Sequence, residues 1–217
     1  MEDGAGPPCL YITGIYRLCQ DWREAMKTLI LVESPTKARA VAQHVRGLWD
    51  GPVAVRSTAG HLRDLPEDRL GVDTADGFAP QYVVRKHRSV SYLRPYVRRA
   101  ERVVLATDPD REGEAIAWHV TKVFKAELRG KTVLRATFHA LTREAVREGL
   151  RNPRPLDRDL VRAAVARRVV DRLIGYHLSP RLWAAMEGKN HGLGRVQAAA
   201  LALLAANGEA WEVEVEA

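Results

Sequence analysis

The sequence contains little of what several classes of protein require. Its 217 residues include only two cysteines, Cys9 and Cys19, which excludes a four-cysteine zinc module and favours a reducing compartment. No run approaches the ~20 apolar residues of a membrane helix, and Glu2 and Asp3 stand where a secretory signal would be basic. With 46% hydrophobic and 28% charged residues, the chain is typical of a globular cytoplasmic protein with one large domain or two small ones.

The excess of positive charge is concentrated in the middle of the chain. Lys and Arg number 34 against 27 Asp and Glu, which gives a net charge of +7. Both ends are acidic: residues 1–26 carry −2 and residues 207–217 carry −4, so residues 27–206 carry +13. A basic body of this kind suits a polyanion such as nucleic acid, although a solvated basic surface explains the charge equally well.

Strands alternate with helices through residues 27–152. Buried strands are predicted at 28–32, 53–57, 103–106 and 132–136, and helices at 35–46, 90–99, 114–124 and 142–150. This order predicts an α/β domain with a mainly parallel sheet and helices on both faces. Residues 1–26 lack such a pattern, and we expect them to be a disordered extension before a natural start at Met26.

The pattern changes in residues 153–217. Long helices are predicted at 157–178 and 195–206, with a glycine-bearing loop at 188–194 between them. Residues 211–216 alternate between apolar side chains and glutamate, which predicts a strand. Because this strand has no evident partner, we expect a small helical segment that begins a second domain and is truncated.

Three carboxylates follow the strand predicted at 103–106. Asp108, Asp110 and Glu112 fall at alternate positions, and an extended loop would turn all three toward one side. Carboxylate oxygens at the carboxyl end of a parallel strand suit Mg²⁺. The alternative is an acidic turn in which Glu112 and Glu114 only favour the start of a helix.

A fourth carboxylate, Glu33, ends the first predicted strand, and a parallel sheet can bring it to the edge that holds Asp108. Lys37 lies four residues later and faces the same way, so its ammonium can hold a phosphate. Taken alone, the Glu33-Ser34-Pro35 segment is equally well explained as an ordinary helix start.

The helix predicted at 157–178 carries a row of basic and aromatic side chains. Arg168, Arg172 and Tyr176 are spaced four apart and therefore share one face. Two guanidiniums and a phenol can bind phosphates and stack an unpaired base, as single-stranded DNA requires. A solvated basic face is the alternative.

Several segments together resemble one family, the type IA DNA topoisomerases. They are residues 31–38 (LVESPTKA), 59–66 (AGHLRDLP), 108–119 (DPDREGEAIAWH), 166–176 (ARRVVDRLIGY) and 194–197 (GRVQ). A glutamate with an Asp-x-Asp pair is shared by all TOPRIM proteins, including primases, type II topoisomerases and nucleases, whereas the longer form ending in Ala-Ile-Ala-Trp-His is typical of type IA enzymes. The resemblance runs from Lys27 to about Gln197, and it implies a TOPRIM-type fold for residues 27–152.

The resemblance also implies an activity and a set of functional residues. Type IA enzymes cleave and pass single DNA strands with Mg²⁺ and without ATP, which implies a cytoplasmic, nucleoid-associated location. The implied Mg²⁺ ligands are Glu33, Asp108, Asp110 and Glu112; Glu33 is also a proton carrier beside the scissile phosphate, and Lys37 and Arg111 add positive charge there. The implied contacts to DNA are His61, Arg63, Arg168, Arg172, Tyr176, Gly194, Arg195, Val196 and Gln197.

The sequence departs from this family most clearly at the nucleophile. Type IA enzymes cleave with a tyrosine in a later domain, and none of the six tyrosines here stands in that context. Residues 138–142 also replace the family's usual Asn-Glu-Ile-Thr run, and no serine precedes Gly194. We therefore expect this chain alone to bind metal and single-stranded DNA without relaxing DNA, with a separate chain as one source of the missing domains.

Two readings from other classes stay open. The chain can be a non-catalytic DNA-binding or regulatory module. It can also be a stand-alone nuclease in which metal-activated water replaces the tyrosine, although the type IA motif makes this the weakest reading.

Overall fold

A four-stranded parallel sheet forms the centre of the protein in the computed structural model, which describes residues 27–49, 51–185 and 194–206. Its strands, in the order β2-β1-β7-β8, are β2 (Val53–Ser57), β1 (Thr28–Val32), β7 (Arg102–Leu105) and β8 (Thr132–Arg135). Each neighbouring pair is parallel. The predicted α/β fold with a mainly parallel sheet is therefore confirmed.

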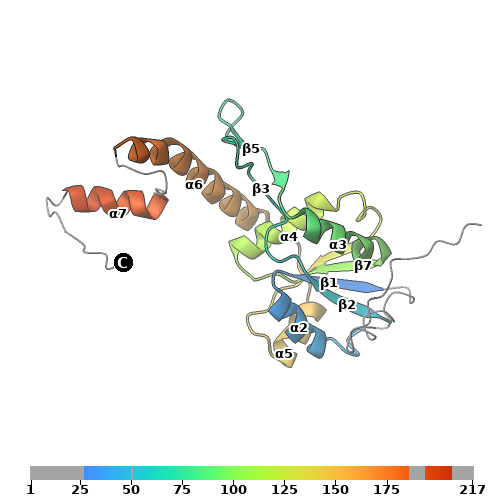
Figure 1. Ribbon diagram of the computed structural model, residues 1–217. Helices are drawn as coiled ribbons and strands as arrows, with labels where there is room; N and C mark the ends of the chain where they lie inside the picture. Colours follow the sequence, from blue (N-terminus) through green and yellow to red (C-terminus); the bar gives the residue numbers. More distant parts are fainter. Residues whose placement is uncertain (1–26, 50, 186–193, 207–217) are drawn as a thin grey trace, which may run out of the picture.

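Helices cover both faces of this sheet because its strands are apolar on both sides (Figure 1). Leu29 and Leu31 of β1 belong to the core that packs against α3 (His87–Arg99) and α4 (Arg111–Val123). Ile30 and Val32 point the other way, toward α2 (Pro35–His44) and α5 (Arg143–Arg151). All five residues of β1 are buried, as expected for a strand covered on two faces.

The segment between β2 and α3, for which no strand was predicted, contains two short antiparallel pairs. β3 (Arg63–Asp64) pairs with β6 (Val83–Val84), and β4 (Val72–Asp73) pairs with β5 (Ala79–Pro80). Strands of two residues are too short to produce a readable alternation. A small third core, centred on Leu65, Val72 and Val169, joins this segment to the long helix that follows α5.

That long helix, α6 (Arg158–Ala185), extends away from the sheet and leads toward α7 (Arg195–Ala206) (Figure 1). Its first part packs against α4. We predicted an end at residue 178, but the helix continues through Pro180. Proline removes one backbone N–H from the hydrogen bonds of the helix and can still be accommodated within it.

Three predicted segments lie outside the described residues: the extension at 1–26, most of the loop at 188–194 and the strand at 211–216. No helix in the described ranges is both long and apolar enough to cross a bilayer.

The close approach of α4 to the loop before it gives a test of the fold. A Cβ added at Gly113 would lie 2.2 Å from the carbonyl oxygen of Asp108, whereas one added at Gly175, in the middle of α6, would meet nothing within 4 Å. We expect Gly113→Ala to lower the free energy of unfolding by about 3 kcal/mol and Gly175→Ala to raise it by up to about 1 kcal/mol. Urea denaturation measures both, and a Gly113→Ala variant as stable as the wild type would contradict this packing.

Candidate functional site

The ends of two adjacent parallel strands bring Glu33 and Asp108 together. Glu33 directly follows β1, and Asp108 comes three residues after the last residue of β7. The Asp108 N–H donates to Glu33 Oε2 at 3.2 Å, and the Lys37 ammonium donates to both carboxylates, at Glu33 Oε1 and Asp108 Oδ1. The predicted meeting of these two acids at one sheet edge is therefore observed, with Lys37 between them.

Lys37 is placed by the start of α2. Ser34 is the N-cap of this helix, its hydroxyl accepts a hydrogen bond from the Lys37 N–H at 3.2 Å, and Pro35 follows at the first helical position. This cap fixes the first turn, which presents the Lys37 side chain to Glu33 one turn away. Burial lowers the pKa of Lys37, but the hydrogen bonds to Asp108 and Glu33 outweigh it, so the net shift is upward and the ammonium stays charged.

The other two predicted metal ligands point elsewhere. We expected an extended loop to turn three carboxylates to one side, but α4 already begins at Arg111, so Asp110 is its N-cap and accepts the Gly113 N–H at 2.7 Å. Glu112 lies in the first helical turn and contacts His61 Nε2 at 2.5 Å. Within the described ranges, no three His, Cys, Asp or Glu side chains are grouped closely enough to hold a metal ion. The helical start, which has a different periodicity from an extended loop, explains the difference.

His61 belongs to a chain of contacts that continues into the protein. Its Nδ1 lies 3.3 Å from Nδ1 of His119, a residue of α4 that is 3% exposed. Burial first, and then the positive charge of Arg63 and the neighbouring His61, lower the pKa of His119 to about 3. His119 is therefore neutral at physiological pH, and it contacts His61 from the interior of the protein.

Arg63 packs against aromatic rings. Its guanidinium lies 4.9 Å from the ring centre of Tyr82 and 4.6 Å from that of Trp118, which is cation–π geometry. Burial lowers the pKa of Arg63. Trp118 and Tyr82 themselves meet edge to face. Arg63, which we predicted to contact DNA, is therefore packed in an aromatic cluster.

The row on α6 faces the loop at 64–69. Arg168 makes a two-pronged ion pair with Asp64, at 2.8 and 2.9 Å, and this hydrogen bonding raises the pKa of Arg168. Arg172 Nη1 lies 3.5 Å from the carbonyl oxygen of Arg69, and Tyr176 is 48% exposed. Arg168 is therefore already committed to a carboxylate, while Arg172 and Tyr176 present the more accessible part of the row.

The remaining predicted DNA contacts lie at the start of α7. The Gly194 N–H donates to Gln197 Oε1 at 2.8 Å, so Gln197 caps its own helix. Arg195 forms an ion pair with Asp171 of α6 at 3.0 Å, and Val196 is 74% exposed. This group is thus joined to the α6 row through Asp171, which also pairs with Arg167.

The sequence interpretation missed two functional groups. Asp64, the partner of Arg168, was not identified because no spacing in the sequence relates it to α6. The two residues come together only in the folded protein. Glu114 and Arg135 form a buried ion pair. One signal could have identified Arg135: it is the charged last residue of β8, in the run Thr-Val-Leu-Arg.

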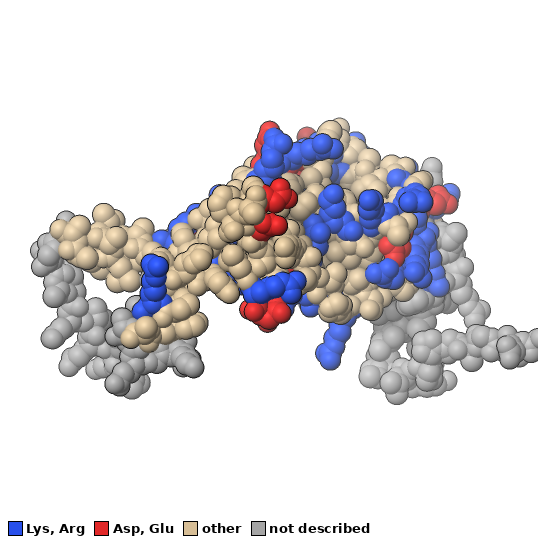
Figure 2. Space-filling model, turned by 90° about the horizontal axis from the view of Figure 1, so that it is seen from above, with Lys and Arg blue, Asp and Glu red and all other residues tan. Residues whose placement is uncertain are grey.

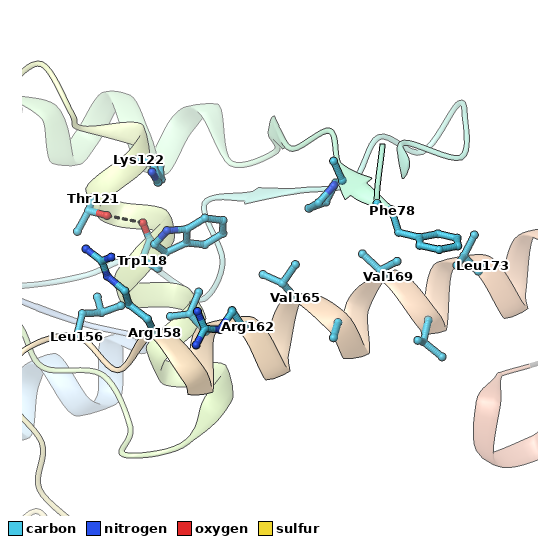
Figure 3. Close-up of a pocket in the computed structure, with 16 residues that line it drawn as sticks. Phe78, Trp118, Thr121, Lys122, Leu156, Arg158, Arg162, Val165, Val169 and Leu173 are labelled. Carbon is cyan, nitrogen blue, oxygen red and sulfur yellow. Dashed lines mark hydrogen bonds between the residues drawn. The ribbon is translucent and has the colours of Figure 1, made fainter. Parts of the chain in front are cut away.

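A groove of about 1070 Å³ lies away from these residues, between α6, α4 and the β4–β5 pair. Figure 3 shows Val165, Val169 and Leu173 of α6 along its floor, with Phe78 and Trp118 on the opposite side. None of the predicted site residues lines it. The groove is therefore lined by aliphatic side chains on α6 and by two aromatic rings opposite them.

Positive charge is spread over the sheet-bearing part of the molecule. In the view of Figure 2, Lys and Arg cover much of this part, and Asp and Glu form a few small clusters among them. The helical arm formed by α6 and α7 is mainly uncharged in the same view. A polyanion therefore meets a field that is basic over the body of the protein.

The buried histidine gives a pH prediction. In the unfolded chain His119 takes up a proton below pH about 6.5, whereas in the folded protein, where its pKa is depressed, it stays neutral down to about pH 3. Protonation therefore favours unfolding, and the free energy of unfolding should fall by about 1.4 kcal/mol per pH unit from this group as the pH drops below 6.5.

Urea denaturation of the wild type and His119→Phe between pH 6.5 and 4.5 measures this slope. The variant cannot titrate at this position, so its stability should fall less steeply with decreasing pH. The exposed His139 provides the control, because His139→Gln should keep the wild-type slope. Identical slopes in all three proteins would contradict a neutral, buried His119.

Comparisons with known proteins identify the family of this chain. A family model described as the Toprim domain matches residues 28–141, and one described as DNA topoisomerase matches residues 155–213. The structure is similar to that of full-length topoisomerase I from Thermotoga maritima, with a TM-score of 0.68 and 38% sequence identity over 81% of this chain. The match covers 29% of the Thermotoga chain. The chain therefore belongs to the Toprim family and corresponds to the amino-terminal part of a type IA DNA topoisomerase.

Proposed function

We propose that this chain forms the Mg²⁺-binding and single-stranded-DNA-binding part of a type IA topoisomerase active centre. One observation carries the proposal: Glu33 and Asp108, from adjacent parallel strands, converge on a single positive charge. The carboxyl edge of a parallel sheet is where open α/β folds place ligands. In this proposal residues 27–152 are the metal-binding domain, and residues from 153 onward begin the DNA-binding domain.

The donor set at this edge suits Mg²⁺. The ion is usually held by one or two carboxylates, and water and substrate phosphates complete its coordination. The Lys37 ammonium is a cation already held by Glu33 and Asp108, so the pair is suited to positive charge. Asp110 and Glu112 are the remaining candidate ligands. When bound, Mg²⁺ would stabilise the charge of the scissile phosphate.

The chain's own residues have separate roles beside that phosphate. Lys37 neutralises the two carboxylates and offers an ammonium to a phosphate oxygen. Glu33, whose side chain is only 15% exposed, is the residue that we assign to carry a proton to or from the cleaved strand end. Arg111 is exposed at the first position of α4, where its guanidinium can reach the DNA backbone.

Two tyrosines of the described residues, Tyr82 and Tyr92, are poor candidates for the nucleophile. Burial raises the pKa of the Tyr82 phenol, which also lies under Arg63 and against Trp118. Burial likewise raises the pKa of Tyr92 on α3. A raised pKa disfavours the phenolate that attacks a phosphate. In this proposal the cleaving tyrosine comes from another part of the enzyme or from a separate chain.

Metal binding can be tested at one carboxylate. Asp108→Asn keeps the size of the side chain and removes its charge, so we expect its Mg²⁺ affinity, measured by calorimetric titration, to fall about tenfold. Asp159→Asn is the matched control, because Asp159 lies on the first turn of α6 with its side chain 81% exposed. Equal Mg²⁺ affinities in the two variants would refute this site.

DNA binding can be tested on α6. Arg172→Ala should weaken binding of a fluorescent oligo-dT several-fold and reduce the salt dependence of log K by about 0.7, the value for one lost phosphate contact on a single strand. Arg162→Ala removes the same charge from the same helix, at a side chain paired with Asp159, and should change the affinity little. If both variants weaken binding equally, general basic charge and not this face attracts the DNA.

A further inference from the structure

Glu114 and Arg135 form an ion pair sealed inside the protein. Glu114 is fully buried, Arg135 is 2% exposed, and Arg135 Nε donates to Glu114 Oε1 at 2.8 Å. Well-packed apolar residues often stabilise a fold as much as a buried ion pair does. The role of the pair is therefore indicated by the other hydrogen bonds that Arg135 and Glu114 make.

The remaining donors of Arg135 hold the loop that carries Asp108. Its two terminal nitrogens donate to the carbonyl oxygens of Leu105 at 3.1 Å, Thr107 at 2.8 Å and Asp108 at 2.7 Å, and also to that of Ala136. Leu105 is the last residue of β7, and Thr107 and Asp108 belong to the backbone between β7 and α4. One rigid guanidinium thus fixes the path of the chain up to the Asp108 carboxylate.

The remaining acceptor of Glu114 holds the start of α6. Its Oε2 accepts the N–H of Asp157 at 3.1 Å, and Oε1 also accepts from Arg154. Asp157 in turn caps α6 by accepting the N–H of Leu160 at 3.0 Å. The same carboxylate therefore contacts Arg135 on one side and the first turn of the long helix on the other.

We infer that Arg135 and Glu114 are positioning residues that lock the Asp108 loop and the first turn of α6 into one rigid unit. The tie sets where the Glu33–Asp108 pair stands relative to the helix that carries Arg172 and Tyr176. This consequence rests on the function proposed above, whereas the tie itself rests on the hydrogen bonds and burial of the two side chains.

Amide hydrogen exchange on Arg135→Lys tests the tie. Lysine keeps the charge, but a single ammonium cannot reach Glu114 and all the loop carbonyls. We expect exchange in residues 105–113 to accelerate about tenfold because local opening costs less free energy. Arg154→Lys is the control: Arg154 contacts Glu114 but none of the loop carbonyls, so residues 105–113 should exchange as in the wild type.

A binding measurement separates positioning from general stability. The affinity of Arg135→Lys for oligo-dT in EDTA should equal that of the wild type, while the gain in affinity on adding Mg²⁺ should fall about tenfold. A loss of affinity in EDTA as large as that in Mg²⁺ would overturn the positioning role. If the wild type gains no affinity from Mg²⁺, the proposed function fails, and the exchange comparison still decides the tie.

Glu114→Gln provides a second variant should Arg135→Lys not fold. Arg135 Nε and the Asp157 N–H bond to different oxygens of Glu114, and an amide has an NH₂ donor in place of one of them, so it cannot keep both bonds. We expect faster exchange in residues 157–162 with unchanged helix content by circular dichroism. Wild-type exchange there, or in residues 105–113 of folded Arg135→Lys, would overturn the inference.

Discussion

The parallel pairing of β1 with β7 places the acidic residues of this protein. Leu31 lies opposite Leu105, and the Ala106 N–H donates to the Leu31 carbonyl at 2.7 Å. Both chains therefore leave the sheet at the same edge, and Glu33 and Asp108 are brought together although they are 75 residues apart in sequence. Because this pairing is buried on both faces, the separation of the two carboxylates is set by the core.

Two carboxylates this close repel each other unless a cation lies between them. Lys37 supplies that charge, and the cap of α2 holds it in reach. The proposed binding of Mg²⁺ or of a phosphate would use this arrangement, since the ammonium can keep one carboxylate and release the other. The ion pairs of Lys37 at this sheet edge can thus change, whereas the backbone that carries Glu33 and Asp108 is fixed.

Rigid ties link this edge to the helical part of the protein. Arg168 and Asp64 join α6 to the loop that begins at β3, and Asp171 joins α6 to Arg195 of α7. Arg135 and Glu114 join α4 to the start of α6 from inside. Arg168 and Arg195, two of the predicted DNA contacts, are therefore held in ion pairs within the protein. The part of the α6 row that is left for the proposed DNA contact is smaller than the row itself.

The sequence by itself determined the alternation of strands and helices, the buried faces and the end of β1 at Glu33, because these depend on local periodicity and on proline and glycine. It also determined the family, through motifs whose residues are close in sequence. The cap by Asp110 is also local, since it accepts the N–H of Gly113 three residues later. Only the tertiary structure decided where Glu112 points, since it meets His61 across a long separation in sequence. The partners of Arg63, Arg168 and Arg135 were decided in the same way: a guanidinium reaches far and binds rings, carboxylates or carbonyls equally well, so its partner depends on which surfaces the fold brings near it.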